Sequence, residues 1–191
     1  MLRTGRKWAG ASILAAILTL PGLVWGASFD YANFNQELGL RFGYGKSNSK
    51  ASVHLYSLLP SWGIAIIKPG QRYGVGLSFV VEGIVSVAEA DDTGFELGIT
   101  PMLKLRLPLG GAAMFFIEGG AGLITESFDS PAIAHSFNFT PQVGAGVDIA
   151  LMPHLGLTAA YRFRHSSNAG LYNENPAFNC HFFHAGLTYF Y

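Results

Sequence analysis

The sequence predicts an all-β protein, an eight-stranded antiparallel transmembrane β-barrel in the outer membrane of a Gram-negative bacterium. Three observations lead to this fold class: an export signal, a composition too apolar for a soluble surface, and a two-residue alternation along the rest of the chain. Of the 191 residues, 50% are hydrophobic and only 13% are charged, whereas soluble domains carry about 25% charged residues. The same balance excludes intrinsic disorder, which requires few apolar residues and many charges.

Residues 1–26 have the features of a cleaved signal peptide. Three basic residues precede a short apolar run at residues 9–20, Pro21 then ends any helix, and Gly26 supplies a small residue for cleavage. The alternative is an uncleaved anchor helix, which needs about 20 apolar residues and fits this segment less well. We therefore expect residues 27–191 to form the barrel. Cleavage removes three basic residues and no acidic one, and the resulting acidic balance argues against nucleic acid as a partner.

The remaining chain alternates between apolar and polar residues. Its apolar runs are broken by charge, Gly or Pro before they could span a bilayer as helices, and a closed barrel is the other structure whose backbone groups all pair within the membrane. In residues 95–109 and 137–151 every odd position is apolar or Pro, while the even positions carry most of the polar residues and Gly. Because a strand alternates faces at each residue, one face of each segment suits contact with lipid.

Eight strands account for the alternating segments, and bacterial outer-membrane barrels have an even number of strands. Short connections alternate with longer polar ones, so we expect the short ones at the periplasmic end and the longer ones outside the cell. Tyr191 ends the last strand with an aromatic residue, which resembles the assembly signal of outer-membrane barrels. The expected strands are residues 36–45, 51–66, 72–87, 95–108, 113–126, 136–151, 155–168 and 181–191.

The charged residues of these strands lie on the face opposite the lipid. A buried charge is costly unless it has a partner, so we expect a paired polar interior in which these side chains have a structural role and no catalytic one. The bases are Arg41, Lys104, Arg106, Arg162 and Arg164, and the acids are Glu37, Glu82, Glu96, Glu118 and Asp148.

Most patterns for cofactor sites are absent. The Gly-rich segments at 119–122 and 144–146 lie inside strands, so they cannot open a helix around a phosphate. His181 and His184 are three residues apart, which on a strand places them on opposite faces and makes them poor co-ligands of a metal. Cys180 is the single cysteine, which excludes a disulfide scaffold and a cysteine-based zinc site. We expect no metal and no organic cofactor.

The segment 161–170 has a different character. Counting from the apolar positions of the seventh strand, Tyr161, Phe163, His165 and Ser167 share the lipid face, so this face ends in a histidine and a serine. Two residues apart on a strand, their side chains are neighbours, and an imidazole beside a hydroxyl is the arrangement that activates a serine nucleophile. The other interpretation is a polar strand end among lipid headgroups, and the alternation alone leaves both open.

Residues 165–170, His-Ser-Ser-Asn-Ala-Gly, resemble the His-x-Ser-Asn-Ala-Gly motif of the lipid A 3-O-deacylases, the PagL-like acyloxyacyl hydrolases. The flanking segments 118–123, 139–147 and 161–163 are also similar to that family, and the resemblance extends over about residues 95–191. It implies an eight-stranded outer-membrane barrel whose active site lies on the lipid-facing outside. The implied reaction removes the ester-linked 3-hydroxyacyl chain at position 3 of lipid A.

The same resemblance implies the catalytic roles. Ser167 is the nucleophile and His165 the general base. Asn168 matches the Asn of the motif that is implicated in oxyanion stabilisation, and its inward parity leaves open whether its side chain or a nearby backbone N–H serves. The best-known relatives carry a Glu at the position of Asn179, and an Asn can also orient an imidazole, as in Cys-His-Asn arrangements. Asn179 is therefore the expected third member, and Glu174, nearby but out of register, is the competing one.

Two further functions remain as alternatives to a serine esterase that acts on lipid A or lipopolysaccharide within outer-membrane lipid. One is a non-enzymatic small barrel with a structural or adhesion role, and the other is an acyltransferase that would add a chain. The feature that discriminates is the pair His165 and Ser167, because a structural barrel has no need for it on its lipid face. The expected assembly is a monomer or a homodimer.

Overall fold

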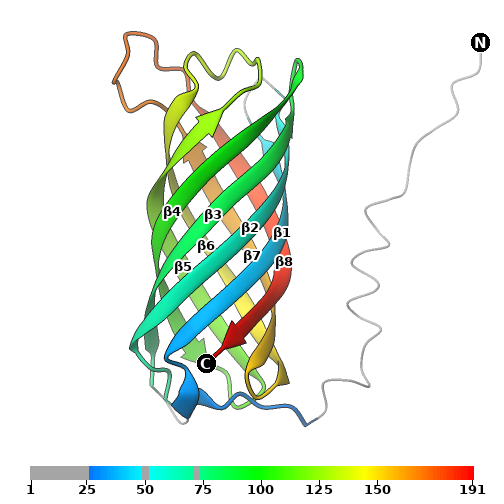
Figure 1. The fold of residues 1–191 in the computed structure, drawn as a ribbon, viewed down its shortest axis with the longest axis vertical. Helices are drawn as coiled ribbons and strands as arrows, with labels where there is room; N and C mark the ends of the chain where they lie inside the picture. Colours follow the sequence, from blue (N-terminus) through cyan, green and yellow to red (C-terminus); the bar gives the residue numbers. More distant parts are fainter. Residues whose placement is uncertain (1–25, 49–51, 71–73) are drawn as a thin grey trace, which may run out of the picture.

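The structure is a computed structural model that describes residues 26–48, 52–70 and 74–191. These residues form a closed antiparallel barrel in which each strand pairs with its chain neighbours and β8 closes against β1 (Figure 1). Within the described ranges no helix is long and apolar enough to cross a membrane. The elements are the 3-10 turn η1 (Tyr31–Asn33) and strands β1 (Gln36–Ser47), β2 (His54–Ile67), β3 (Gly76–Glu89), β4 (Thr93–Pro108), β5 (Ala113–Glu126), β6 (Phe137–Met152), β7 (Leu155–Ser166) and β8 (Phe178–Phe190).

The predicted fold class and the number of strands are confirmed, and the difference that bears on the predicted site concerns the start of β8. This strand begins at Phe178 rather than at residue 181, because Phe178 and Cys180 both pack into the apolar core at that end of the barrel. Asn179 therefore lies within a strand and not in the preceding loop. At the other end of the same connection, β7 stops at Ser166, and Ser167 continues its pairing as a single bridge to Phe139.

Some of the expected segments lie outside the described residues. Residues 1–25 of the predicted signal peptide are outside the described ranges. Residues 51 and 72, where the second and third strands were expected to begin, are outside them as well. The described parts of those strands begin at His54 and Gly76. The two longest described loops follow β5 and β7, and both rise at the end of the barrel opposite the C-terminus (Figure 1).

The alternation of faces follows the sequence prediction. In β6, for example, Gln142 is 6% exposed and its neighbour Val143 is 55% exposed. Large apolar side chains are exposed along every strand and together form the outer surface. In a soluble protein this surface would be unstable, whereas in an outer-membrane barrel it is the band that contacts lipid.

All ten charged residues predicted to face inward are buried in the barrel interior. Arg162 on β7 donates a hydrogen bond of 2.5 Å to Glu82 on β3 and contacts Glu118 on β5. Arg41 on β1 lies 3.2 Å from Glu82 and 3.4 Å from Glu118. These four residues form a central cluster that ties four strands together, as the expected pairing requires.

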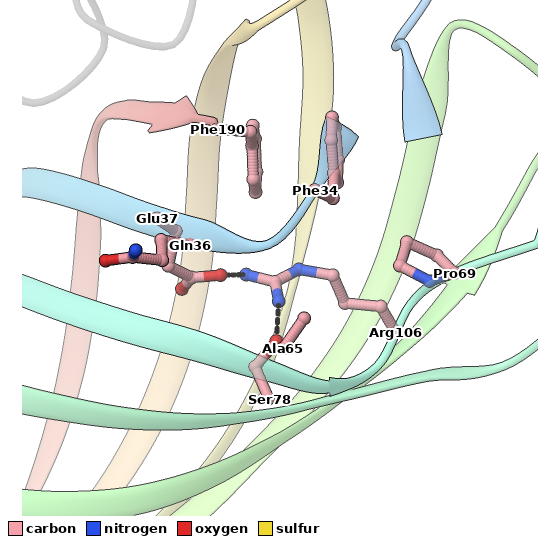
Figure 2. Close-up of a pocket in the computed structure, with 8 residues that line it drawn as sticks. All are labelled: Phe34, Gln36, Glu37, Ala65, Pro69, Ser78, Arg106 and Phe190. Carbon is pink, nitrogen blue, oxygen red and sulfur yellow. Dashed lines mark hydrogen bonds and ion pairs between the residues drawn. The ribbon is translucent and has the colours of Figure 1, made fainter. Parts of the chain in front are cut away.

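The remaining interior charges pair toward the two ends of the barrel. Arg106 forms an ion pair with Glu37 and donates to Ser78 at 2.8 Å, beneath the stacked rings of Phe34 and Phe190 (Figure 2). Lys104 lies 3.9 Å from Asp148, and Arg164 donates to Glu96 at 2.6 Å. The predicted paired interior is confirmed.

Apolar clusters close both ends of this charged interior. Phe29, Tyr31 and Phe34 pack with Phe190 at the end where β1 starts and β8 finishes. At the opposite end, Phe128 packs with residues of β2, β3 and β8. Two small cavities among the described interior residues hold about 10 Å3 each, which is at most the space of one water molecule. Neither can hold a lipid substrate.

Candidate active site

The predicted catalytic segment lies at the outer end of β7. His165 and Ser167 face outward and are half-buried, whereas Ser166 and Asn168 are buried. The backbone of Ser167 is held by Phe139 on β6, which donates to the Ser167 carbonyl at 2.8 Å and accepts from the Ser167 N–H at 3.2 Å. This bridge keeps Ser167 in the register of the strand, so its hydroxyl stays on the same outer face as His165.

His165 is held by Asn179 on the neighbouring strand. The two residues are direct partners in the β7–β8 register, and His165 Nδ1 lies 2.8 Å from Asn179 Oδ1. An amide oxygen can only accept a hydrogen bond, so Nδ1 carries the proton of the ring. His165 Nε2 then has the lone pair that a general base needs.

Glu174, the competing third residue, lies elsewhere. It is exposed in the loop between β7 and β8, where its side chain borders a shallow pocket beside His135 and Tyr172. Among the described residues its carboxylate makes no hydrogen bond to His165. The structure thus brings Asn179 and not Glu174 to the imidazole.

Asn168 organises the bend that follows Ser167. Its side-chain Nδ2 donates to the Glu174 carbonyl at 2.7 Å, and its Oδ1 accepts from the Gly170 N–H at 2.9 Å. Between these contacts Ala169 has a positive φ of 54°, which non-glycine residues rarely adopt. The buried amide of Asn168 therefore holds a strained turn directly beside Ser167.

The hydroxyl of Ser167 and the ring of His165 share a face. Within the part of the chain that the structure describes, no hydrogen bond joins them. Catalytic hydrogen bonds are often long in the free enzyme and shorten when substrate binds.

A buried contact behind the site was missed by the sequence analysis. Ser166, between His165 and Ser167, donates to Glu126 at 3.0 Å, and Glu126 also accepts from Asn138 at 2.5 Å. Glu126 has the same parity on its strand as Glu118, so the alternation could have placed it in the interior. Its contacts anchor the inner face of the strand end that carries the candidate site.

A comparison with protein-family models decides the family. The sequence matches the model described as lipid A 3-O-deacylase (PagL) over residues 58–188. The chain belongs to the lipid A 3-O-deacylase family. This match includes His165, Ser167 and Asn179, and it starts earlier in the chain than the resemblance found from the motif. Members of this family are enzymes that hydrolyse ester bonds, so the barrel is an ester hydrolase.

Solved structures agree with the fold of a lipid A 3-O-deacylase. The crystal structure of the outer membrane enzyme PagL is similar with a TM-score of 0.65 and 22% identity, over 78% of this chain and 97% of that one. The crystal structure of Neisserial surface protein A is similar with a TM-score of 0.59 and 16% identity, over 82% of this chain and 97% of that one. A search of curated protein sequences found no match. Both structural neighbours share the outer-membrane barrel fold, which supports the predicted localisation.

Proposed function

We propose that this lipid A deacylase is a serine esterase that removes the 3-hydroxyacyl chain at position 3 of lipid A. The observation that carries this proposal is the half-buried His165, held by Asn179, on the same outer face as Ser167. Lipid A lies in the outer leaflet, so a site at the outer end of the barrel meets the acyl ester without extracting it from the membrane. The export and cleavage of residues 1–26 belong to the same proposal.

The proposed reaction uses only side chains of this chain and water. His165 Nε2 takes the proton of the Ser167 hydroxyl, and Ser167 Oγ bonds to the carbonyl carbon of the ester. The bond between that carbon and the sugar oxygen then breaks, and the sugar leaves with the proton from His165. Water then gives a proton to the same imidazole and attacks the carbonyl carbon of the acyl-serine. The bond from that carbon to Ser167 Oγ breaks, Oγ takes the proton back from His165, and a 3-hydroxy fatty acid is released.

Asn179 and Asn168 have supporting roles in this proposal. Asn179 keeps the imidazole in the tautomer that leaves Nε2 free, and it favours the imidazolium that forms during each step. Asn168 holds the turn after Ser167, in which the N–H groups of Asn168, Gly170 and Leu171 already have acceptors. The Ala169 N–H, with no acceptor among the described residues, is the backbone donor proposed to meet the oxyanion. The role of Asn168 is then to position this donor, because its own side chain is turned inward and bonded to the loop.

The direct test is a product analysis. We expect detergent-purified protein incubated with lipid A to yield lipid A that lacks one 3-hydroxyacyl chain and one equivalent of the free fatty acid, both measured by mass spectrometry. Unchanged lipid A would favour the non-enzymatic barrel. A gain in mass by one acyl chain would instead indicate an acyltransferase.

Asn179→Ala should lower kcat by about 10-fold to 100-fold, because the imidazole loses its orienting partner but keeps its reactivity. Asn179→Glu should keep or raise kcat, since a carboxylate accepts the same hydrogen bond and carries the charge found in the best-known relatives. Glu174→Ala is the matched control and should leave kcat unchanged. The choice of Asn179 is wrong if Glu174→Ala removes activity while Asn179→Ala retains it.

A further inference from the structure

A row of basic and aromatic residues borders the candidate active site on the outer face. The site itself occupies one transverse row, in which His165 on β7 faces Asn179 on β8. The N–H of Asn48, directly after β1, donates to the Asn179 carbonyl at 3.1 Å and extends this row to a third strand. The next row toward the membrane contains Phe163, His181 and Lys46 on the same three strands.

Lys46 is distinctive on this surface. The register places His181 of β8 on one side of it and His54 of β2 on the other. Of the Lys and Arg residues in the described strands, it alone faces outward, and among the described residues its ammonium makes no ion pair. A cation without a partner at the outer end of an apolar barrel lies at the depth of the lipid headgroups.

The two histidines beside Lys46 are held in place by hydrogen bonds. His181 Nδ1 lies 2.6 Å from the Tyr161 hydroxyl, and His181 Nε2 lies 3.3 Å from Asn48 Nδ2. Because an amide nitrogen only donates, Nε2 is the acceptor and Nδ1 donates to the Tyr161 oxygen. The hydrogen of the Tyr161 hydroxyl is then free to donate to an outside acceptor.

A groove lies beside Lys46 and His181. It has a volume of about 480 Å3 and runs between β1 and β8, with Lys46, Asn48 and His181 beside the rings of Tyr44 and Phe183. A positive charge and an amide donor above apolar walls suit an anion that is attached to a lipid. A phosphate monoester provides that charge, and Lys is a common phosphate binder.

We propose that this groove binds a phosphate of the lipid A substrate and so places the acyl ester at Ser167. The inference rests on the proposed function, because it names how that site selects its substrate. From the register, the Cα atoms of Lys46 and His165 are about 12 Å apart, given a strand spacing of about 4.8 Å and a rise of about 3.3 Å per residue. One phosphorylated disaccharide headgroup can reach both residues, given the length of the lysine side chain.

The first experiment measures KM in mixed micelles for bisphosphorylated and for fully dephosphorylated lipid A. With the bisphosphorylated substrate, Lys46→Met should raise KM about five-fold, as expected for one partly exposed charge pair, with little change in kcat. With the dephosphorylated substrate the same variant should match the wild type. Lys46→Arg should restore KM, and Lys68→Met, at the opposite end of the barrel, is the matched control.

A second experiment separates this inference from the reaction. Native mass spectrometry of the Ser167→Ala protein counts bound lipid A without turnover, and Lys46→Met in that background should lower the bound fraction about five-fold for the bisphosphorylated form alone. An equal loss for both forms of lipid A would overturn the phosphate assignment. The change in KM caused by Lys46→Met could instead depend on the amount of anionic phospholipid in the micelle and not on the phosphates of the substrate. That result would overturn the assignment to the substrate.

The two proposals can fail independently. A wild-type protein that deacylates no form of lipid A would reject the proposed function, and the binding measurement would still decide on the groove. Normal deacylation with the same KM in the wild type and in Lys46→Met would reject the groove and leave the proposed function in place.

Discussion

Ser167→Ala and His165→Ala should each remove deacylation of lipid A, with a loss of about four orders of magnitude or more in kcat. Nucleophile and base act as one unit, so the double variant should be little worse than either single one. The rate of release of 3-hydroxy fatty acid, followed by mass spectrometry, measures this effect. The heat-modifiable mobility of the barrel on a gel shows that each variant is folded.

Ser166→Ala is the matched control for this result. Ser166 lies between the two residues in sequence, but its hydroxyl points into the barrel and contacts Glu126. We expect this variant to retain activity and to lose about 1 kcal/mol of stability, the contribution of one hydrogen bond. Full activity of Ser167→Ala would reject the serine mechanism while leaving the fold and the family unaffected.

Arg162→Met should destabilise the barrel by about 3–5 kcal/mol, because it leaves buried carboxylates with too little positive charge. Arg162 contacts both Glu82 and Glu118 in the barrel centre, and Arg41 alone then has to pair with the two acids. The measurement is the urea midpoint of unfolding in lipid vesicles. Lys68→Met removes the same charge from an exposed position, where Lys68 Nζ donates to the Ala32 carbonyl at 3.0 Å, and should change the midpoint far less.

A second substitution tests the electrostatic origin of that loss. In the Arg162→Met background, Glu118→Gln removes the excess negative charge of the cluster while keeping the shape of the side chain. We expect it to recover part of the lost stability, although alone it should destabilise the barrel. Equal midpoints for Arg162→Met and the Lys68→Met control would contradict the central role given to the cluster.

The face of each strand residue could be predicted because it depends on local parity. One residue along a strand reverses the direction of the side chain, so the sequence alone placed Glu82 and Arg162 inside and His165 and Ser167 outside. The same argument applies to Glu126, which lies eight residues from Glu118 on β5 and so shares its inward face. It was not named in the sequence analysis. The prediction of eight strands follows from the same pattern.

The position of Asn179 could not be predicted in this way. It depends on where β8 begins, and the sequence prediction started that strand at residue 181, after Asn179. Phe178 and Cys180 pack into the apolar cluster at the outer end, and this packing extends the strand to include Asn179. The motif named Asn179 only by resemblance, whereas its contact with His165 follows from the register.

The sequence by itself determined the class of fold, the face of the charged residues, and the shared face of His165 and Ser167, since each follows from alternation or from a short motif. The tertiary structure decided which acid meets which base, which residue holds His165, and that Lys46 and His181 border one groove. The central ion pairs join strands that are far apart in the chain, the contact of His165 with Asn179 depends on the β7–β8 register, and β1 meets β8 only because the barrel closes. Strand register and closure are set by the packing of the whole barrel, and no local pattern in the sequence contains them.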